Sequence, residues 1–437
     1  MILAVKIRRY TSHVVESGAH EAVEQDVTEE QVEDMPGPLS DANLHKADIS
    51  SDSEEPAFAK AFNRTSHKRY SSIQSAIDSA TDGDVIEAAA CTHYESIDFK
   101  GKSITVRSFD PDDWDVVKKT IIDANGRSKA VYFRNSEDDN SVLKGFKITG
   151  ADRIGIDCRG ASPIIANCLI KSNGDDDKGG GMYNRKGASP NVTNCVFSYN
   201  KAEIGGGMYN DDSSPTVTNC VFAKNWVEDY GAGMCNDEGA SPAVTNCVFY
   251  SNEAESGGGG GMYNDESSPT IINCTFYENE SEDDYGGAIY NRRRSNATLS
   301  NCIFWNNVAE GAGGAGDEIY NKDSEPTFSY CCIRGGLNGS RCGGDDSIDG
   351  EWNINDSPNF YNRRNPDGAD DIWSTSDDGL RLKGDSHCID AGDNSAISEP
   401  DDITGNTRKI DAPNTMDTGN GRAPIVDMGA YEYDPGS

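Results

Sequence analysis

Residues 214–240 read SPTVTNCVFAKNWVEDYGAGMCNDEGA, and related copies of this segment follow one another through the middle of the chain. The phrase Ser-Pro-x-x-x-Asn-Cys-x-Phe occurs at 189–197, 214–222, 241–249 and 268–276. The cysteines of successive copies lie 27, 25, 27, 27 and 28 residues apart: Cys168, Cys195, Cys220, Cys247, Cys274 and Cys302. A period of this length is typical of one supersecondary unit that stacks on copies of itself, which predicts a solenoid.

The apolar pattern inside one copy indicates strands. Val217, Cys220 and Phe222 alternate as inward residues of two short runs, and the phase of the alternation slips at Asn219. A slip of one residue would turn all later side chains to the other face, so the chain has to bend there. Asparagine tolerates the left-handed conformation of such a corner. We therefore predict an all-β, single-stranded parallel β-helix; the rival at this length, a leucine-rich repeat, lacks its Leu-x-x-Leu-x-Leu signature.

Stacking turns sequence positions into columns, because neighbouring rungs lie about 4.8 Å apart. The cysteines are predicted to fill the interior as small buried hydrophobic side chains. A metal site is the alternative, but the CxxC spacing of a zinc knuckle is absent from the sequence. The corner asparagines are predicted to form a ladder of side-chain amide hydrogen bonds: Asn167, Asn194, Asn219, Asn246, Asn273 and Asn301.

Three regions follow from the change of pattern along the chain. Residues 1–66 are acidic and without periodicity, which predicts a disordered leader. Residues 67–349 form the β-helix, with regular repeats over about 162–333. A helix capped by Ser71 or Ser72 has one apolar face and is predicted to plug the N-terminal end. Residues 350–437 lose the period and are predicted to return along the β-helix as an irregular cap that covers its C-terminal end.

The composition narrows the classes of partner. The 437 residues include 74 acidic and 39 basic side chains, a net charge of −35 at pH 7. This charge argues against nucleic acid and anionic membranes as partners. It either keeps the surface solvated or serves a specific cation. No stretch approaches the roughly 18 apolar residues of a membrane span, and Met1–Val5 is too short for the apolar core of a signal peptide.

The turn after each Tyr-Asn pair is the candidate metal site. In three consecutive copies it is acidic: Asp211/Asp212, Asp237/Glu238 and Asp265/Glu266. Carboxylates stacked at rung spacing repel by about 1 kcal/mol or more per pair, so something has to offset them. Clustered hard oxygen ligands suit Ca²⁺, which is the predicted cofactor. The alternatives are a solvated turn with screened charges, or the same role for the acidic run at 175–177, 228–229 and 282–284.

A column of tyrosines is the candidate sugar-binding surface. The methionine or isoleucine before each tyrosine is the better core residue, which leaves the rings to face outward and stack on sugars. The alternative is that the rings pack beneath neighbouring loops. The column comprises Tyr183, Tyr209, Tyr263, Tyr290 and Tyr320. Histidine is absent from the sequence between His93 and His387, which argues against histidine-based hydrolysis on the repeats.

Several phrases outside the repeats resemble a known group. The opening YSSIQSAIDSATDGDVIEA (70–88), SVLKGFKITG (141–150) and the closing DMGAYEY (427–433) are similar to bacterial right-handed parallel β-helix proteins of the pectin-lyase-like superfamily. The resemblance covers roughly residues 70–433 and implies a right-handed β-helix that is extracellular or on the cell surface. More narrowly, Gly286–Ile289 and the Phe-x-x-Asn tetrapeptides resemble the repeats of polymorphic outer-membrane adhesins.

Two functions stay open at this point. One is a non-catalytic module, a rigid rod for adhesion or for binding a polysaccharide or cell-surface glycan. The other follows from the resemblance, because related β-helix lyases hold Ca²⁺ with acidic residues and use a lysine or arginine as base. It implies a Ca-dependent lyase or hydrolase acting on an acidic glycan, with Arg292 as the base. The repeats offer few long loops to wall a groove, which favours the non-catalytic module.

Overall fold

The computed structural model describes residues 59–174, 178–283, 285–311, 316–337, 342–344 and 349–436. The chain divides into two units, Met1–Glu54 and Glu55–Ser437, and all described residues belong to the second. The predicted leader therefore lies mostly outside the described residues. The described fold begins with a strand at Ala61–Asn63, earlier than the predicted boundary at residue 66. Neither helix in the described ranges has the length and hydropathy needed to cross a bilayer.

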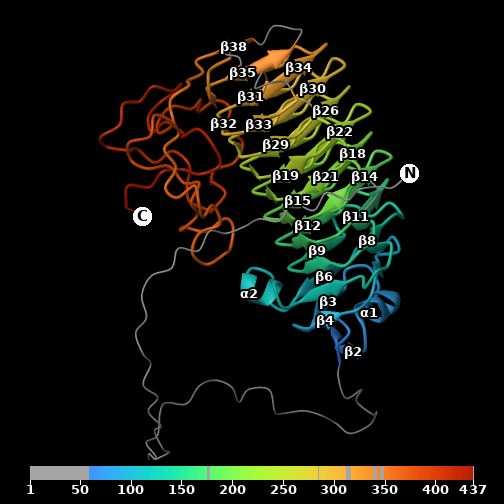
Figure 1. The fold of residues 1–437 in the computed structure, drawn as a ribbon. Coiled ribbons are helices and arrows are strands. Elements are labelled where there is room, and N and C mark those ends of the chain that lie inside the picture. Colours follow the sequence, from blue (N-terminus) through green and yellow to red (C-terminus); the bar gives the residue numbers. More distant parts are fainter. Residues whose placement is uncertain are drawn as a thin grey trace, which may run out of the picture. The chain divides into compact units, whose positions relative to one another are not determined.

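Short strands stack into three long sheets and one short sheet (Figure 1). Sheet A contains β1 (Ala61–Asn63), β2 (Lys68–Tyr70), β3 (Val85–Ala88), β6 (Thr105–Ser108), β9 (Val142–Lys144), β12 (Ile164–Ala166), β15 (Asn191–Thr193), β19 (Thr216–Thr218), β23 (Ala243–Thr245), β27 (Thr270–Ile272), β31 (Thr298–Ser300), β35 (Thr327–Ser329) and β38 (Asp349–Glu351). Sheet B contains β4 (Thr92–His93), β7 (Ile121–Asp123), β10 (Lys147–Thr149), β13 (Leu169–Lys171), β16 (Val196–Ser198), β20 (Val221–Ala223), β24 (Val248–Tyr250), β28 (Thr275–Tyr277), β32 (Ile303–Trp305) and β36 (Cys332–Ile333).

The other two sheets complete each rung. Sheet C contains β5 (Ile97–Asp98), β8 (Lys129–Phe133), β11 (Ile154–Arg159), β14 (Met182–Arg185), β18 (Met208–Asp211), β22 (Met234–Asp237), β26 (Met262–Asp265), β30 (Ile289–Arg292), β34 (Ile319–Lys322) and β37 (Cys342–Gly344). The short sheet contains β17 (Lys201–Ala202), β21 (Trp226–Val227), β25 (Glu253–Ala254), β29 (Glu280–Ser281) and β33 (Val308–Ala309). The helices are α1 (Ile73–Ser79) and α2 (Trp114–Val117).

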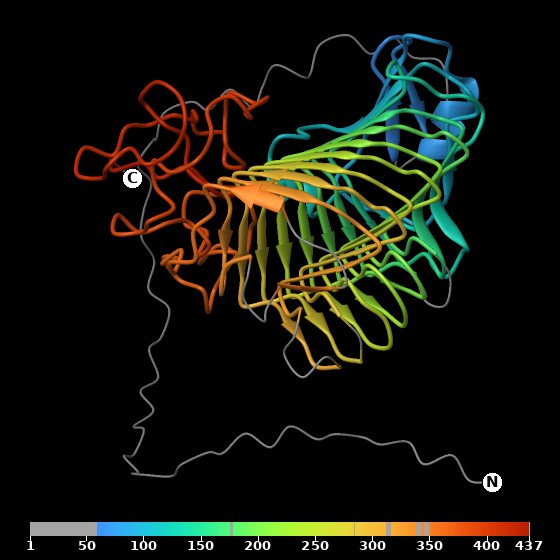
Figure 2. The ribbon, with the colours of Figure 1, turned by 90° about the horizontal axis from the view of Figure 1, so that it is seen from above.

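Equivalent residues of neighbouring rungs pair directly, so the predicted columns are real. In sheet B, Phe197 pairs with Phe222, and Phe222 pairs with Phe249, all in parallel strands. Antiparallel pairing among the described strands is confined to the N-terminal edge, where β1 pairs with β2 and β3. Seen from above, the rungs follow one another in an unbroken stack (Figure 2). The all-β parallel β-helix predicted from the repeat is confirmed.

The predicted N-terminal helix is also confirmed. Ser72 caps α1 by accepting a hydrogen bond from the amide of Ser75, and the Ser75 hydroxyl accepts one from the amide of Ser72. Ile73, Ala76 and Ile77 are buried against the first rungs, on the apolar face that the sequence indicates. Capping satisfies donors that would otherwise be left at the helix start, which stabilises so short a helix. The helix covers the end of the hydrophobic core.

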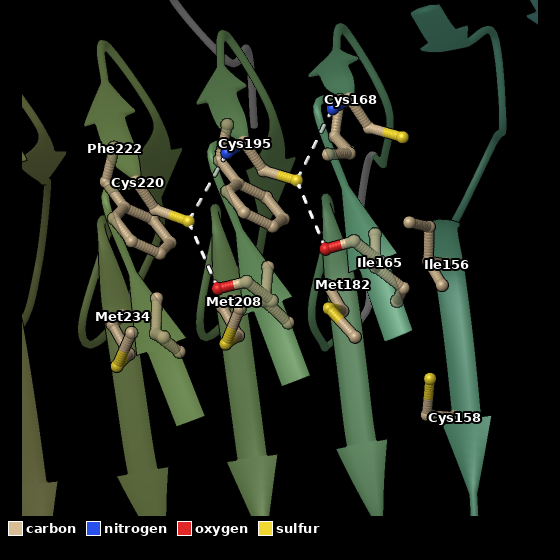
Figure 3. Close-up of a cluster of buried hydrophobic side chains, with 14 of the residues drawn as sticks. Ile156, Cys158, Ile165, Cys168, Met182, Cys195, Met208, Cys220, Phe222 and Met234 are labelled. Atoms are coloured by element: carbon tan, nitrogen blue, oxygen red, sulfur yellow. Dashed lines mark hydrogen bonds between the residues drawn. The ribbon is translucent and has the colours of Figure 1, made fainter. Parts of the chain in front are cut away.

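The cysteine column lies inside the β-helix, as predicted. Cys168, Cys195 and Cys220 are fully buried beside the stacked phenylalanines, and their Sγ atoms follow one another from rung to rung (Figure 3). The Cys195 thiol lies 3.3 Å from the carbonyl of Thr193, and the amide of Cys168 lies 3.4 Å from Cys195 Sγ. Burial raises the pKa of the Cys195 thiol well above its ordinary value. Cys168 and Cys195, whose thiol pKa values are both raised by burial, are core residues with little thiolate character.

The corner asparagines adopt the predicted conformation but form only part of the predicted ladder. Their φ angles are all positive, between 51° and 56°. Side-chain hydrogen bonds join them in pairs rather than continuously: Asn194 to Asn167 at 3.2 Å, Asn246 to Asn219 at 3.0 Å and Asn301 to Asn273 at 3.5 Å.

Two continuous asparagine ladders lie elsewhere, at positions where the sequence analysis predicted none. Asn173 and the asparagine of each Phe-x-x-Asn are buried and bond from rung to rung, from Asn173 to Asn307. The asparagine of each Tyr-Asn forms a second chain from Asn184 to Asn321, with donor–acceptor distances of 2.7–2.8 Å. Because buried amides need partners, these ladders satisfy the inner asparagines of both columns. The exceptions lie at the two ends of the second ladder, where Oδ1 of Asn184 and Nδ2 of Asn321 have no hydrogen-bond partner among the described residues.

The C-terminal cap, residues 350–436, packs on the flank of the β-helix, against the outer face of sheet B (Figures 1 and 2). The described cap residues thus return along the β-helix and lie on its flank, whereas the prediction placed them over its C-terminal end. The reason is the outward-facing apolar column Val221, Val248 and Ile303, which needs cover and packs with cap residues such as Trp373 and Leu380. Isolated bridges, including Phe360 with Leu382, are the regular pairing in the described part of the cap beyond β38. The cap is irregular, as predicted.

The last three corner asparagines dock the cap. Asn246 donates to the carbonyl of Asp401 at 2.8 Å, and Asn273 donates to the carbonyl of Asp427 at 3.3 Å. Asn301 donates to the carbonyl of Asp393 at 3.1 Å and accepts from its amide at 2.7 Å. The corner asparagines thus form the bend of each rung, and the last three of them also attach the cap.

A buried carboxyl predicts how cap stability depends on pH. Burial raises the pKa of Asp378 from 3.8 to about 7, despite hydrogen bonds from the Tyr431 hydroxyl and the Ser374 amide. Because the folded pKa is the higher one, the stabilisation is complete below about pH 4 and is lost as the pH rises towards 7. We expect cap stability, followed by tryptophan fluorescence during thermal unfolding, to fall by up to about 1.4 kcal/mol per pH unit over this range. An Asp378→Asn variant should flatten the profile; an unchanged slope would contradict the assignment.

Candidate functional site

The acidic turns and the tyrosine column, predicted as two separate sites, form one hydrogen-bonded network. Tyrosine hydroxyls donate to carboxylates that follow the Tyr-Asn pairs, which removes much of the repulsion expected between stacked carboxylates. The bonds are Tyr183 to Asp211 at 2.8 Å, Tyr209 to Asp237 at 3.1 Å and Tyr263 to Asp265 at 3.2 Å. The offset that the sequence analysis required therefore comes from the neighbouring column.

The prediction that the tyrosine rings face outward is wrong. Tyr183, Tyr209, Tyr263 and Tyr290 are 9%, 1%, 3% and 4% exposed, and Tyr320 is half-buried. The cause is the glycine run before each tyrosine, which lets the turn lie directly on the ring. At Gly205, where φ is +69°, a Cβ atom would lie 2.6 Å from Cβ of Tyr209. The rings pack against one another, with centroids 5.0 Å apart for Tyr183 and Tyr209, and offer no open face to a sugar.

The second residue of each acidic turn points to solvent. Asp212, Glu238 and Glu266 are exposed and have φ angles of 49°, 53° and 50°. The charge of Asp211 in the preceding rung raises the pKa of Glu238. Asp265 is buried and bonds to Arg293. Within the described ranges, these turns bring no three carboxylates together as a metal site would need. Calcium at the turns stays a prediction, as it does for the alternative run, of which 175–177 and 284 lie outside the described residues.

Arg292, the predicted base, lies beside the tyrosine column. Its guanidinium lies 3.4 Å from the hydroxyl of Tyr263, on the side of the network just described. This contact raises the pKa of Arg292 above its ordinary value. A base has to lose its proton near the working pH, and Arg292 is held in the protonated form. Its position therefore favours a role in offsetting the acidic turns.

A groove that the sequence analysis missed lies on the outer face of sheet B, between α2 and the cap. Its volume is about 660 Å³, within the range of ligand sites. One wall belongs to the β-helix and α2, and the other belongs to cap residues 365–373. The groove is lined by four lysines, Lys118, Lys147, Lys171 and Lys224, by the aromatic residues Trp114, Tyr199 and Trp373, and by two carboxylates, Asp367 and Asp371.

Strand geometry explains why these side chains share one face. Each strand of sheet B sends its middle residue inward and its outer residues to the surface. Lys147 is the first residue of β10 and Lys171 the last residue of β13, in neighbouring rungs. Tyr199 and Lys224 occupy the next corner in later rungs, with φ angles of 54° and 56°. A positive φ is uncommon for such residues and turns their side chains out beside the sheet.

The groove reverses the charge of the rest of the molecule. Its four lysines outnumber its two carboxylates in a chain with a net charge of −35. The Lys171 ammonium lies 4.8 Å and the Lys224 ammonium 5.6 Å from the ring centre of Tyr199, which is 47% exposed. Burial alone would lower the pKa of Lys224, but contacts with Tyr199, Tyr250 and Asp367 outweigh it and raise the pKa. Lys224 therefore keeps its positive charge beside an open aromatic ring.

One sequence signal pointed to part of this groove. Lysine or tyrosine stands at the corner before the Phe-x-x-Asn asparagine only in some rungs, as in Phe-Ser-Tyr-Asn (197–200) and Phe-Ala-Lys-Asn (222–225). Other rungs have serine or glutamate at the same corner, at Ser251 and Glu278. The change of residue type along an otherwise repeated column marks the place where the surface is specialised.

The fold and the groove define a class: a parallel β-helix with one basic groove beside an irregular cap. The family model described as right handed beta helix region matches residues 115–222 and 204–349, which together span more than half of the 437 residues. The chain belongs to this family, and the right-handed parallel β-helix is confirmed. No curated protein matches the sequence. The crystal structure of pectate lyase Pel9A is 13% identical, covering 83% of this chain and 91% of that chain, with a TM-score of 0.44, a likeness too distant to bear on function.

Proposed function

We propose that this protein binds an acidic polysaccharide in the groove on sheet B without cleaving it, outside the cell or on its surface. The observation that carries the proposal is the cluster of four lysines beside exposed Tyr199, on a chain that is otherwise strongly acidic. A neutral sugar would need aromatic and hydrogen-bonding groups but no excess of cations. Uronate or sulfate groups would be repelled by most of the surface and attracted to this groove. The charge distribution would thus determine both where the polysaccharide binds and how tightly.

The spread of cations in the groove suits a chain of sugars. Lys147 and Lys171 come from consecutive rungs but from opposite ends of their strands, since Lys147 pairs with Leu169. Four cations on different elements can meet several anions of one polymer, whereas a single small anion would use only one or two of them. Tyr199 supplies a ring on which a sugar ring can stack.

The alternative is a Ca-dependent lyase or hydrolase that acts on an acidic glycan. A hydrolase would use two carboxylates, and Asp367 and Asp371 both line the groove. A lyase would use a base, but the raised pKa of Lys224 keeps this lysine protonated. The predicted base, Arg292, belongs to sheet C and does not line the groove. Binding without cleavage therefore fits the groove better.

The test removes positive charge without shortening the side chains. We expect Lys171→Gln combined with Lys224→Gln to weaken binding of polygalacturonate or alginate at least tenfold, about 1.4 kcal/mol or more. Binding of both polymers, measured by calorimetry, should also weaken as salt is added, because screening acts on these charges. Lys201→Gln is the matched control: Lys201 is exposed on β17, stacks on Trp226 and lies outside the groove lining.

Two outcomes would overturn the proposal. Equal affinity of the double variant and the wild type would show that the groove is not the binding site. Equal affinity of the wild type for neutral dextran would show that binding does not depend on anionic groups. Release of unsaturated uronates, followed by ultraviolet absorbance, or of new reducing ends would show cleavage. Loss of that cleavage in Asp367→Asn or Asp371→Asn would then assign the reaction to the groove.

A further inference from the structure

We propose that Asp390, Asp411 and Asp417 form a calcium-binding site inside the C-terminal cap. The site is distinct from the groove and from the acidic turns of the repeats, and it does not depend on the function proposed above. One carboxylate oxygen from each aspartate lies within 4.8 Å of the others, in the only such acidic trio among the described residues. Asp390 is fully buried, whereas Asp411 and Asp417 are exposed.

The second observation is the state of the Asp390 side chain. Both of its carboxylate oxygens are buried, and neither completes a hydrogen bond. A buried carboxylate without a partner is costly, and two further carboxylates close by add repulsion. The backbone of Asp390 is fully engaged: its carbonyl accepts from the amides of Thr418 and Gly419, at 2.9 and 3.1 Å, and its amide donates to Asp427 at 2.8 Å. The Asp390 carboxylate lies beside those of Asp411 and Asp417. The backbone of Ala412, which follows Asp411, also lies close to it.

A cation resolves this arrangement. Calcium takes oxygen ligands at about 2.3–2.6 Å, so two ligands on opposite sides of it are roughly 5 Å apart. The trio falls within that span. The ligands are all carboxylates, and the two exposed members leave room for water to complete six to eight positions, which suits Ca²⁺ better than the strict octahedron of Mg²⁺. By contrast, the carboxylates of Asp211, Asp237 and Asp265 already have tyrosine partners.

A calcium ion at this site would affect how the cap is held on the β-helix. Asp390 lies three residues before Asp393, which holds Asn301 of the β-helix through two hydrogen bonds. Asp411 and Asp417 belong to a later loop of the cap. A bound ion would join this loop to the docking segment. We therefore expect calcium to protect residues 411–422 from proteolysis and to raise the unfolding temperature of the cap.

The experiment compares calcium binding in matched full-length variants. The first is Asp411→Asn with Asp417→Asn, whose exposed positions tolerate substitution; the second is Asp390→Asn. Asp401→Asn is the control for charge, since Asp401 is exposed in the same cap and outside the trio. Asp211→Asn with Asp237→Asn is the control for the acidic turns. Calorimetry with CaCl₂ should show one saturable site in the wild type and both controls, and at least tenfold weaker binding in the two trio variants.

Limited proteolysis with and without a chelator gives an independent readout. The wild type should lose protection of residues 411–422 when calcium is removed, and the trio variants should be insensitive to it. The cap site is wrong if the trio variants keep the wild-type isotherm, or if the wild type shows only weak, non-saturating binding to its acidic surface. Loss of the site in Asp211→Asn with Asp237→Asn alone would also overturn it and would place calcium at the repeats.

Discussion

Replacing Asn225 by alanine is expected to lower the free energy of unfolding of the β-helix by about 5 kcal/mol. The Asn225 side chain is 1% exposed and makes four hydrogen bonds in the asparagine ladder that runs from Asn173 to Asn307. It accepts from the amide and the side chain of Asn200, at 3.0 and 3.1 Å, and donates to Phe197 and Asn252, both at 2.9 Å. Truncation leaves these partners buried and unpaired, at about 1–3 kcal/mol each before any water enters.

Chemical denaturation followed by circular dichroism measures this effect. Asn194→Ala is the matched control, because Asn194 is exposed and its side chain makes one hydrogen bond, to Asn167. Its loss, together with the strain of alanine at a φ of 52°, should cost about 1–2 kcal/mol. Equal losses in the two variants would show that the inner ladder contributes no more than an exposed corner. The interior would then be held by apolar packing alone.

Replacing Arg408 by methionine is expected to release the cap, at a cost of about 5 kcal/mol. Arg408 is 2% exposed and connects the cap to the β-helix: it donates to Asn246 Oδ1 at 2.8 Å and to the carbonyl of Ala430 at 2.9 Å. It also lies 3.5 Å from Glu432. Without the guanidinium, Glu432 and the neighbouring Asp427 stay buried with no cation, and breaking such a pair is far more costly than losing a surface contact.

Limited proteolysis with mass spectrometry distinguishes release of the cap from unfolding of the whole chain. Cleavage should appear in residues 350–436 of Arg408→Met, while the β-helix remains intact. Arg422→Met is the matched control, because Arg422 is exposed in the same cap. Simultaneous cleavage throughout both regions would mean that cap and β-helix unfold as one cooperative unit. A cap as resistant as that of the wild type would mean that Arg408 does not secure it.

The repeated sequence pattern allowed correct prediction of features that depend on local sequence and on contacts between neighbouring rungs. The cysteine column, the left-handed corners at Asn167 to Asn301 and the helix beginning near Ser72 all follow from local pattern and period, and all are confirmed. The tyrosine column was assigned to the surface because methionine is the stronger core candidate. In the structure Met208 and Tyr209 are both buried, on opposite faces of β18. The sequence shows that Gly205 precedes Tyr209 by four residues. It does not show that the backbone turn at this glycine lies against the tyrosine side chain.

The groove could not be predicted from the repeat because half of it is not in the repeat. Lys171 and Trp373 lie about two hundred positions apart and meet only because the cap settles on the flank of sheet B. The docking of the cap depends on single contacts, such as that of Arg408 with Asn246, which do not recur from repeat to repeat and so leave no periodic signal in the sequence. The trio of Asp390, Asp411 and Asp417 is likewise brought together by loops without regular structure.

The inner ladders have a consequence for how such a molecule can change its length. Since each rung joins the next through the same amide bonds, a whole unit can be duplicated or deleted and all those bonds re-form. An insertion of a few residues inside a strand would break register in the ladders on either side. The cap is tied to particular rungs through Asn246, Asn273 and Asn301. One added unit between these rungs and Lys171 would therefore slide the two walls of the groove apart by about 4.8 Å.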